Sequence, residues 1–368
     1  MNKEICISSE LAPLLRSTHC GMQKTLIKQV TRRNPFRIRA VPVLARVYSY
    51  PYNRWPTSRG RQILFGSPNL ALFSLLRRVQ PFGGKGTFEL IRQETATPIS
   101  FDARNTQFQA VYLKAFANGY EPELTALFDV IVKPGDTFLD VGSNWGFFSL
   151  FVASKTGFKG KVVAFEPFPS TFRDLKATVD QSGLAGVIEC RNVALSDFVG
   201  ETTMSLPDLT HSGLATIEAP GKRGQQIPVS TLDALEIQAS LIKIDAEGSE
   251  GSILAGGKNY LRKHRPTLVI ENWRSFSQVS QTLRPLQILE ECGYVFYHPC
   301  WLRSFDGRDY FISAESSADL KDVETLSLVP MSLEERFLRH DQINVLACHR
   351  DKLAELGSQF EVRNAVLI

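Results

Sequence analysis

The chain has 368 residues, which suits one large domain with additions or two domains. Its hydrophobic share of 43% supports a sizeable core, and no stretch approaches the roughly 20 apolar residues of a membrane-spanning helix. The net charge of +4 is unevenly distributed, because residues 1–85 hold 15 Lys and Arg against two Asp and Glu. The composition therefore gives no sign of a membrane-spanning helix and indicates a basic leader on an acidic body.

The basic leader, residues 1–85, contains frequent prolines that interrupt any long element. Its charge is compatible with contact to nucleic acid, to an anionic membrane surface or to an acidic partner, and equally with a solvated extension. Pro81-Phe82-Gly83-Gly84 suits a boundary turn. We predict an N-terminal extension of unknown role over 1–85, one large domain over 86–350 and a C-terminal tail over 351–368.

The cysteines and the N-terminus indicate a cytoplasmic protein. None of the six cysteines forms a CxxC pair or a zinc-type spacing, so we expect reduced thiols, several of them buried. The N-terminus lacks the apolar core and cleavage pattern of a signal peptide. The oligomeric state is left open by the sequence.

The most informative stretch is 134–151, where a short apolar strand leads into a glycine-rich turn and then into an apolar run that suits a helix. Asp140 ends the strand, and Gly142, Asn144 and Gly146 follow at close spacing. This GxNxG pattern is shorter than the glycine spacing that seats a pyrophosphate. It therefore favours a nucleoside ligand without a diphosphate, for which S-adenosylmethionine is the obvious candidate.

Further apolar segments alternate with helical patterns along the rest of the chain, as in a parallel sheet covered on both faces. With the strand before Asp140, the expected strands are 162–165, 187–190, 241–244, 267–270, 294–298 and 344–348. We expect a mostly parallel, doubly wound sheet of seven strands. Two inserted arms, 198–224 and 300–341, are expected to shape the substrate pocket.

Four of the expected strands end in an acidic residue: Asp140, Glu166, Asp245 and Glu271. In open α/β sheets, ligands bind outside the carboxyl ends of the strands, so these groups should face one crevice. Glu166 follows Asp140 by 26 positions and is placed to accept hydrogen bonds from two ribose hydroxyls.

Several motifs in fixed order give the chain a family resemblance. They are Tyr120-Glu121, Pro134-Gly135-Asp136, DVGSNWG at 140–146, AFEP at 164–167, NVALSD at 192–197, STLDAL at 230–235, KIDAEGSE at 243–250 and the segment 266–271. With these motifs, residues 88–272 resemble the FkbM-type methyltransferases, an S-adenosylmethionine-dependent family with a Rossmann-like fold. Ser143 and Ala246 depart from the usual DVGANxG and DVEGSE patterns, and the leader lies outside the resemblance.

The resemblance implies a set of cofactor-binding residues. Asp140 and the turn Gly142, Ser143, Asn144 and Gly146 would hold the methionine end, with Glu121 at its ammonium group. Glu166, followed by Pro167, would bind the ribose. The segment 192–197, with Asn192 and Ser196, would border the adenine.

The resemblance and the strand-end position also favour Asp245 near the transferring methyl. A hydroxyl acceptor needs a base, for which Asp245, Glu247 and His211 are candidates. Lys243 could steady a developing alkoxide, or could instead pair with Glu247. The carboxylates of Asp245 and Glu247 are of the type that can hold Mg²⁺, but no metal is expected to be required.

The leading hypothesis is an O-methyltransferase acting on a small-molecule or glycan acceptor, namely a hydroxyl of a sugar, glycolipid or natural product. One alternative is a nucleic-acid methyltransferase that uses the basic leader, although IDAEGSE stands where amino-methylating enzymes carry a polar-Pro-Pro-aromatic motif. Another is a non-catalytic binding protein on the same fold. A dehydrogenase is disfavoured because the longer dinucleotide glycine pattern is missing.

Overall fold

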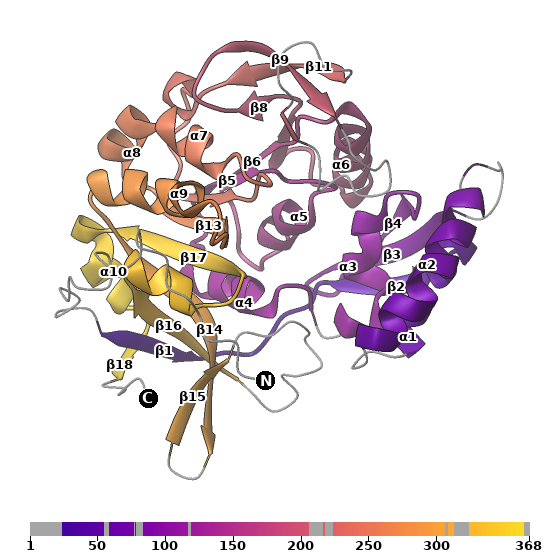
Figure 1. Ribbon diagram of the computed structural model, residues 1–368, viewed down its shortest axis with the longest axis horizontal. Coiled ribbons are helices and arrows are strands. Elements are labelled where there is room, and N and C mark those ends of the chain that lie inside the picture. The colour runs from indigo at the N-terminus through magenta and orange to yellow at the C-terminus, as the bar shows by residue number, and fades with distance from the viewer. Residues whose placement is uncertain are drawn as a thin grey trace.

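The computed structural model describes residues 24–54, 59–76, 78, 84–116, 119–205, 216–217, 224–305, 308–312 and 324–363. Its centre is an 11-stranded mixed sheet in the order β18-β1-β16-β14-β17-β13-β12-β5-β6-β7, with β15 paired to β14. Helices cover this sheet, and two smaller sheets lie at its periphery (Figure 1). The fold is therefore of the predicted α/β class.

One half of the main sheet is parallel and carries the strands expected around the glycine-rich turn. Its strands are β5 (Thr137–Val141), β6 (Lys161–Phe165), β7 (Ile188–Arg191), β12 (Leu241–Ile244) and β13 (Thr267–Trp273). All four residues of β12 are buried, as continuous apolar runs predict for strands that are covered on both faces. The connecting helices are α5 (Phe147–Ala153), α6 (Pro169–Ser182), α7 (Glu250–Ala255) and α8 (Lys258–His264).

The other half is antiparallel and is larger than the sequence predicted. Its strands are β17 (Gln342–His349), β14 (Tyr294–Phe305), β16 (Thr325–Met331), β1 (Thr25–Gln29), β18 (Glu361–Arg363) and β15 (Arg308–Ile312). Helix α9 (Val279–Glu291) leads into it. All seven expected strands are present, but the expectation of a seven-stranded, mostly parallel sheet was wrong. The described part of the sheet has eleven strands, and six of them are antiparallel.

Strand β14 continues past its predicted end at His298, as far as Phe305, and pairs with three other strands. Its first residues pair with β17, its middle with β16 and its last residues with β15. Pro299 interrupts the strand pattern in the sequence, which hid this extension. Strand β1, from the predicted leader, pairs with β16 and β18, so part of the leader and part of the tail belong to the main sheet. The domain boundary near residue 85 stays a prediction.

Each of the two smaller sheets combines antiparallel neighbours with a strand from another part of the chain. One contains β2 (Phe36–Ala40), β3 (Lys85–Arg92) and β4 (Thr95–Asp102), and lies beside helices α1 (Val43–Arg54) and α2 (Arg59–Leu76) (Figure 1). The other contains β8 (Ala194–Leu195), β9 (Gly200–Ser205), β10 (Thr216–Ile217) and β11 (Gln225–Ser230). The remaining helices are α3 (Gln109–Tyr112), α4 (Pro122–Ile131) and α10 (Leu353–Gly357). In the described part of the chain, no helix has the length and apolar character needed to cross a bilayer.

Candidate active site

A cavity of about 470 Å³ lies where the parallel strands end, a volume typical of small-ligand sites. Ten of the predicted site residues line it: Glu121, Asp140, Gly142, Ser143, Asn144, Glu166, Pro167, Lys243, Asp245 and Glu247. Gly146, Asn192 and Ser196 do not line it, and His211 lies outside the described residues. The strand tips thus gather most of the predicted residues around one space.

Gly142 allows the tips of β5 and β12 to meet. Its φ is +79°, in the left-handed region that favours glycine, and a Cβ on it would lie 1.8 Å from the backbone oxygen of Asp245. The amides of Gly142 and Ser143 both donate to the Phe165 carbonyl at 3.0 Å, which ties the turn to β6. Gly146, at φ +93°, starts α5 and shapes the turn from behind the cavity. No other residue type fits at position 142 without separating the strands.

Asp140 presents a buried, partly unsatisfied carboxylate to this cavity. The side chain is only 1% exposed, and its Oδ2 accepts a hydrogen bond from the Ser149 hydroxyl at 2.6 Å. Its Oδ1 has no hydrogen-bond partner among the described residues. Burial raises the pKa of Asp140, against the opposing charge of Lys243. A buried acceptor without a donor is costly, so this oxygen suits a ligand that brings one.

Glu166 is held rigidly at the tip of β6. Its two carboxylate oxygens accept hydrogen bonds from the amides of Asn144 at 3.0 Å and Phe168 at 2.9 Å. Burial raises its pKa to about 8. Asn192 supports this strand end from behind, because its amide donates to the carbonyls of Glu166 and Pro167. Ser196 is buried, donates a hydrogen bond to its neighbour Asp197 at 3.3 Å and does not line the cavity.

Lys243 is a buried cation at the centre of the carboxylates. It is 3% exposed, and its Nζ lies 2.8 Å from Asp245 Oδ2 and 4.6 Å from the centre of the Phe148 ring. Burial opposes its charge, but the carboxylates of Asp245, Asp140 and Glu121 outweigh burial and raise its pKa. Lys243 therefore stays charged and pairs with Asp245, not with Glu247, the partner considered from the sequence.

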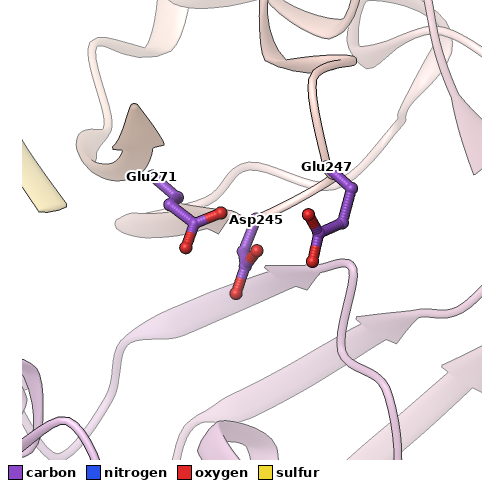
Figure 2. Close-up of side chains that lie close together, drawn as sticks. All are labelled: Asp245, Glu247 and Glu271. Carbon is purple, nitrogen blue, oxygen red and sulfur yellow. The ribbon is translucent and has the colours of Figure 1, made fainter. Parts of the chain in front are cut away.

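Asp245, Glu247 and Glu271 form a cluster of three carboxylates whose oxygens lie within 4.8 Å of one another. Asp245 lies between the other two (Figure 2). Burial, reinforced by the neighbouring carboxylates, raises the pKa of Glu247 to about 7 and that of Glu271 to about 9. Such a cluster can hold either protons or a hard cation.

Glu121 reaches the same region from the N-terminal end of α4. Its φ is +41°, and its Oε2 accepts a hydrogen bond from the Asn344 side chain at 3.3 Å. Burial raises its pKa, whereas the charge of Lys243 lowers it. The ring of Tyr120, which also lines the cavity, packs edge-on against Phe147.

Sequence reasoning missed several lining residues, which it had no local motif to find. Trp273 and Gln342 line the cavity from β13 and β17, and Met204 lines it from the first inserted arm. Glu271 accepts hydrogen bonds from both the Trp273 indole, at 3.0 Å, and the Gln342 amide. The acidic strand end at Glu271 was the only signal for this group.

Comparisons with known proteins connect this site to a family. A family model described as "Methyltransferase FkbM domain" matches residues 136–296. The chain is 31% identical to 31-O-demethyl-FK506 methyltransferase FkbM of Streptomyces tacrolimicus over 163 residues, covering 34% of this chain and 61% of that protein. It is 37% identical over 97 residues to AMB antimetabolite synthetase AmbE of Pseudomonas aeruginosa, covering 26% of this chain and 4% of that protein. The chain thus matches less than two thirds of the length of each of these relatives.

Solved structures show only a distant likeness. The FkbM methyltransferase of Methylobacillus flagellatus has 18% identity and a TM-score of 0.33, with 54% of this chain and 44% of that chain covered. Precorrin-6y C5,15-methyltransferase of Geobacter metallireducens has 12% identity and a TM-score of 0.32, with 62% and 89% covered. The assignment rests on the sequence matches, which contain the motifs that line the cavity. Residues 136–296 of this chain match the model of the methyltransferase FkbM domain, and through them the chain is similar to the FkbM methyltransferases.

Proposed function

We propose that the protein is an S-adenosylmethionine-dependent O-methyltransferase that acts on a hydroxyl of a sugar, glycolipid or natural product. The observation that carries the proposal is the single cavity in which the carboxylates of Asp140, Glu166 and Asp245 meet at neighbouring strand tips. The relative from Streptomyces tacrolimicus, whose name describes a 31-O-demethyl-FK506 methyltransferase, supports oxygen as the accepting atom.

The residues present fit this cofactor. The unpaired Asp140 Oδ1 would accept hydrogen bonds at the methionine end, with Glu121 near the ammonium group. Gly142 lines the cavity and lets the tips of β5 and β12 meet beside the place proposed for the ligand. Glu166 would accept hydrogen bonds from the ribose hydroxyls. Val193, Ala194 and Leu195 line the cavity where the adenine was expected, so we propose them as its apolar border, with Asn192 and Ser196 behind them.

When bound, S-adenosylmethionine supplies an activated methyl group, and the protein must orient the acceptor and remove its proton. Asp245 and Glu247 lie close enough together to act at one acceptor hydroxyl. Glu247, with a pKa near 7, is matched to work as a base at neutral pH. Lys243 remains charged and would stabilise negative charge that develops on the acceptor oxygen. A role for His211 stays a prediction.

The test is transfer of a labelled methyl group from S-adenosylmethionine to a panel of hydroxyl-bearing glycosides and lipids by the purified full-length protein. Label in an alkali-stable ether product supports O-methylation. Label in RNA or DNA would instead favour the nucleic-acid alternative, and cofactor binding without transfer to any acceptor would favour a binding protein. A chelator in the same assay tests the expectation that Mg²⁺ is not required. The cytoplasmic location of the protein stays a prediction.

A further inference from the structure

A second cavity, of about 480 Å³, adjoins the candidate active site. The two cavities share the side chains of Tyr120, Glu121, Trp273 and Gln342. The rest of the second cavity is lined from the start of α4, from β14 and from the segment that leads into β17. A ligand in the active site could therefore extend past Trp273 into the second cavity.

Carboxylates dominate the charge of the second cavity. Glu121, Glu123 and Asp341 line it, and its described lining residues include no lysine or arginine. Burial, with a contribution from nearby Arg339, lowers the pKa of His298 to about 3, so this lining residue is uncharged at neutral pH. The one lysine that lines the active-site cavity in the described part of the chain, Lys243, is already paired with Asp245. Asp341 is paired with Arg274, so a phosphate group in this cavity would meet the carboxylates of Glu121 and Glu123 with no lysine or arginine among the described lining residues.

The wall between the two cavities offers a flat aromatic surface in a fixed orientation. Trp273 is 49% exposed, yet its indole N–H donates to Glu271 at 3.0 Å. The Gln342 amide donates to the other oxygen of the same carboxylate. Glu271 thus connects Trp273 on β13 with Gln342 on β17. An exposed indole face packs well against the apolar face of a ring whose edges carry hydroxyl groups.

A buried arginine holds this wall from behind. Arg336 is 0% exposed, and its guanidinium donates to the carbonyls of Asn272 at 2.6 Å, His340 at 2.8 Å and Asp341 at 2.8 Å. Asn272 immediately precedes Trp273, and His340 and Asp341 are the two residues before Gln342. The wall is therefore organised before any ligand arrives, which lowers the entropic cost of binding.

We propose that the second cavity binds the part of the methyl acceptor remote from the reacting hydroxyl, and that it selects uncharged, polyhydroxylated ring compounds over their phosphorylated counterparts. This inference rests on the proposed function and adds to it a location and a charge rule for the acceptor. Trp273 packs against the ring of the acceptor. The carboxylates and amides around it hydrogen-bond to the acceptor's hydroxyl groups.

Saturation-transfer NMR on the full-length protein with bound S-adenosylhomocysteine tests this rule. The probes are a panel of methyl hexopyranosides and their 6-phosphates. We expect the neutral probes that bind to do so at least ~10-fold more tightly than their phosphates. Trp273→Ala should weaken their binding by a similar factor, whereas Phe276→Ala removes a similarly exposed ring that lines neither cavity and should change nothing. Asp341→Lys, at an exposed position, should reduce the difference in affinity between neutral and phosphorylated probes.

Calorimetry on the same samples distinguishes a failure of cofactor binding from a failure of the proposed acceptor selectivity. If S-adenosylhomocysteine does not bind, both the proposed function and this inference are overturned. If it binds, three results overturn the acceptor rule alone: equal affinity for neutral and phosphorylated probes, no binding of any neutral probe, or unchanged binding after Trp273→Ala.

Discussion

The two halves of the main sheet differ in direction, and this difference determines what each contributes to the site. In the parallel half, from β13 to β7, every carboxyl end points to the same edge, and Asp140, Glu166 and Asp245 meet there. In the antiparallel half, neighbouring strands end at opposite edges, so their tips cannot converge. That half instead supplies a side wall, through Gln342 and Asn344 near the start of β17.

The comparison indicates that the two halves of the sheet have different roles. The parallel half resembles the FkbM methyltransferases in its motifs and carries the groups proposed for the cofactor and the chemistry. The antiparallel half, which contains the strands added beyond the expected seven, borders the cavity proposed for the acceptor. Cofactor binding and acceptor choice should therefore respond to mutations in different halves.

The largest expected effect is on kcat, from a change at Asp245, which follows β12 in the parallel half. Asp245→Asn should lower kcat by about 10²- to 10³-fold, because it removes the carboxylate that positions Lys243 for the charge developing on the acceptor, and leave the cofactor Kd nearly unchanged. Rapid-quench or steady-state transfer assays measure kcat, and calorimetry measures Kd. The control is Asp180→Asn, an exposed carboxylate on α6 that pairs with Lys176 at 2.8 Å. An Asp245 variant with wild-type kcat would exclude this residue from catalysis.

Gly142→Ala should damage the parallel half structurally. The added Cβ would approach the Asp245 carbonyl to 1.8 Å at a φ of +79°, so the free energy of unfolding should fall by about 3 kcal/mol. Gly157→Ala is a matched control. Gly157 has a φ of +80°, but no described neighbour lies within 4 Å of the place its new methyl group would take, so the change should cost about 1 kcal/mol. Urea denaturation followed by circular dichroism measures both. Equal losses of unfolding free energy in the two variants would mean that the tips of β5 and β12 are not in close contact.

Glu271, which bonds to groups from both halves, should make stability depend on pH. Its pKa is raised from about 4.5 to about 9, so the folded state favours the protonated form. Its contribution is fully present below pH 4.5 and is lost as the pH rises through 9. We expect Glu271→Gln to reduce the loss of stability between pH 6 and 9 by about 2 kcal/mol. An unchanged slope in denaturation curves would show that Glu271 is ionised in the folded protein.

The smallest expected effect is on the pH profile of the reaction. Because Glu247 has a pKa near 7 and a base must be ionised, the wild-type rate should rise as the pH passes through 7. Glu247→Gln should remove this rise and lower kcat at about pH 8 by about tenfold. If the variant keeps the same inflection, the base lies elsewhere, with Asp245 as the first alternative.

The sequence predicted the parallel half well because its information is local. Asp140, Gly142 and Glu166 lie at strand ends, next to turns that short sequence motifs predict. These local motifs were therefore enough to predict that the three residues face one cavity. The wall of the second cavity depends on pairings between distant segments, such as Trp273 with Gln342 across β13 and β17. No periodicity marks such a contact, and Pro299 concealed the length of β14.

Part of the leader also depends on pairing with distant segments, which its local sequence does not reveal. Strand β1 has only five residues, and it is defined by its partners, Leu328 on β16 and Val362 on β18, rather than by its own pattern. The ring contacts of Trp145 with Phe36 and Phe88 likewise join the glycine-rich turn to the small hairpin sheet. Charge alone suggested an appendage, whereas packing includes part of it in the fold.

The most direct measurement is a calorimetric titration of S-adenosylmethionine into the wild-type protein, Glu166→Gln and Glu189→Gln. Glu189 is a partly exposed carboxylate on the neighbouring strand β7, paired with Lys161, and serves as the control. The account predicts one site in the wild type, similar affinity in Glu189→Gln and at least ~10-fold weaker binding in Glu166→Gln, since a buried hydrogen-bonding partner of the ligand is altered. No binding to the wild-type protein, or equal affinity in all three, would contradict it.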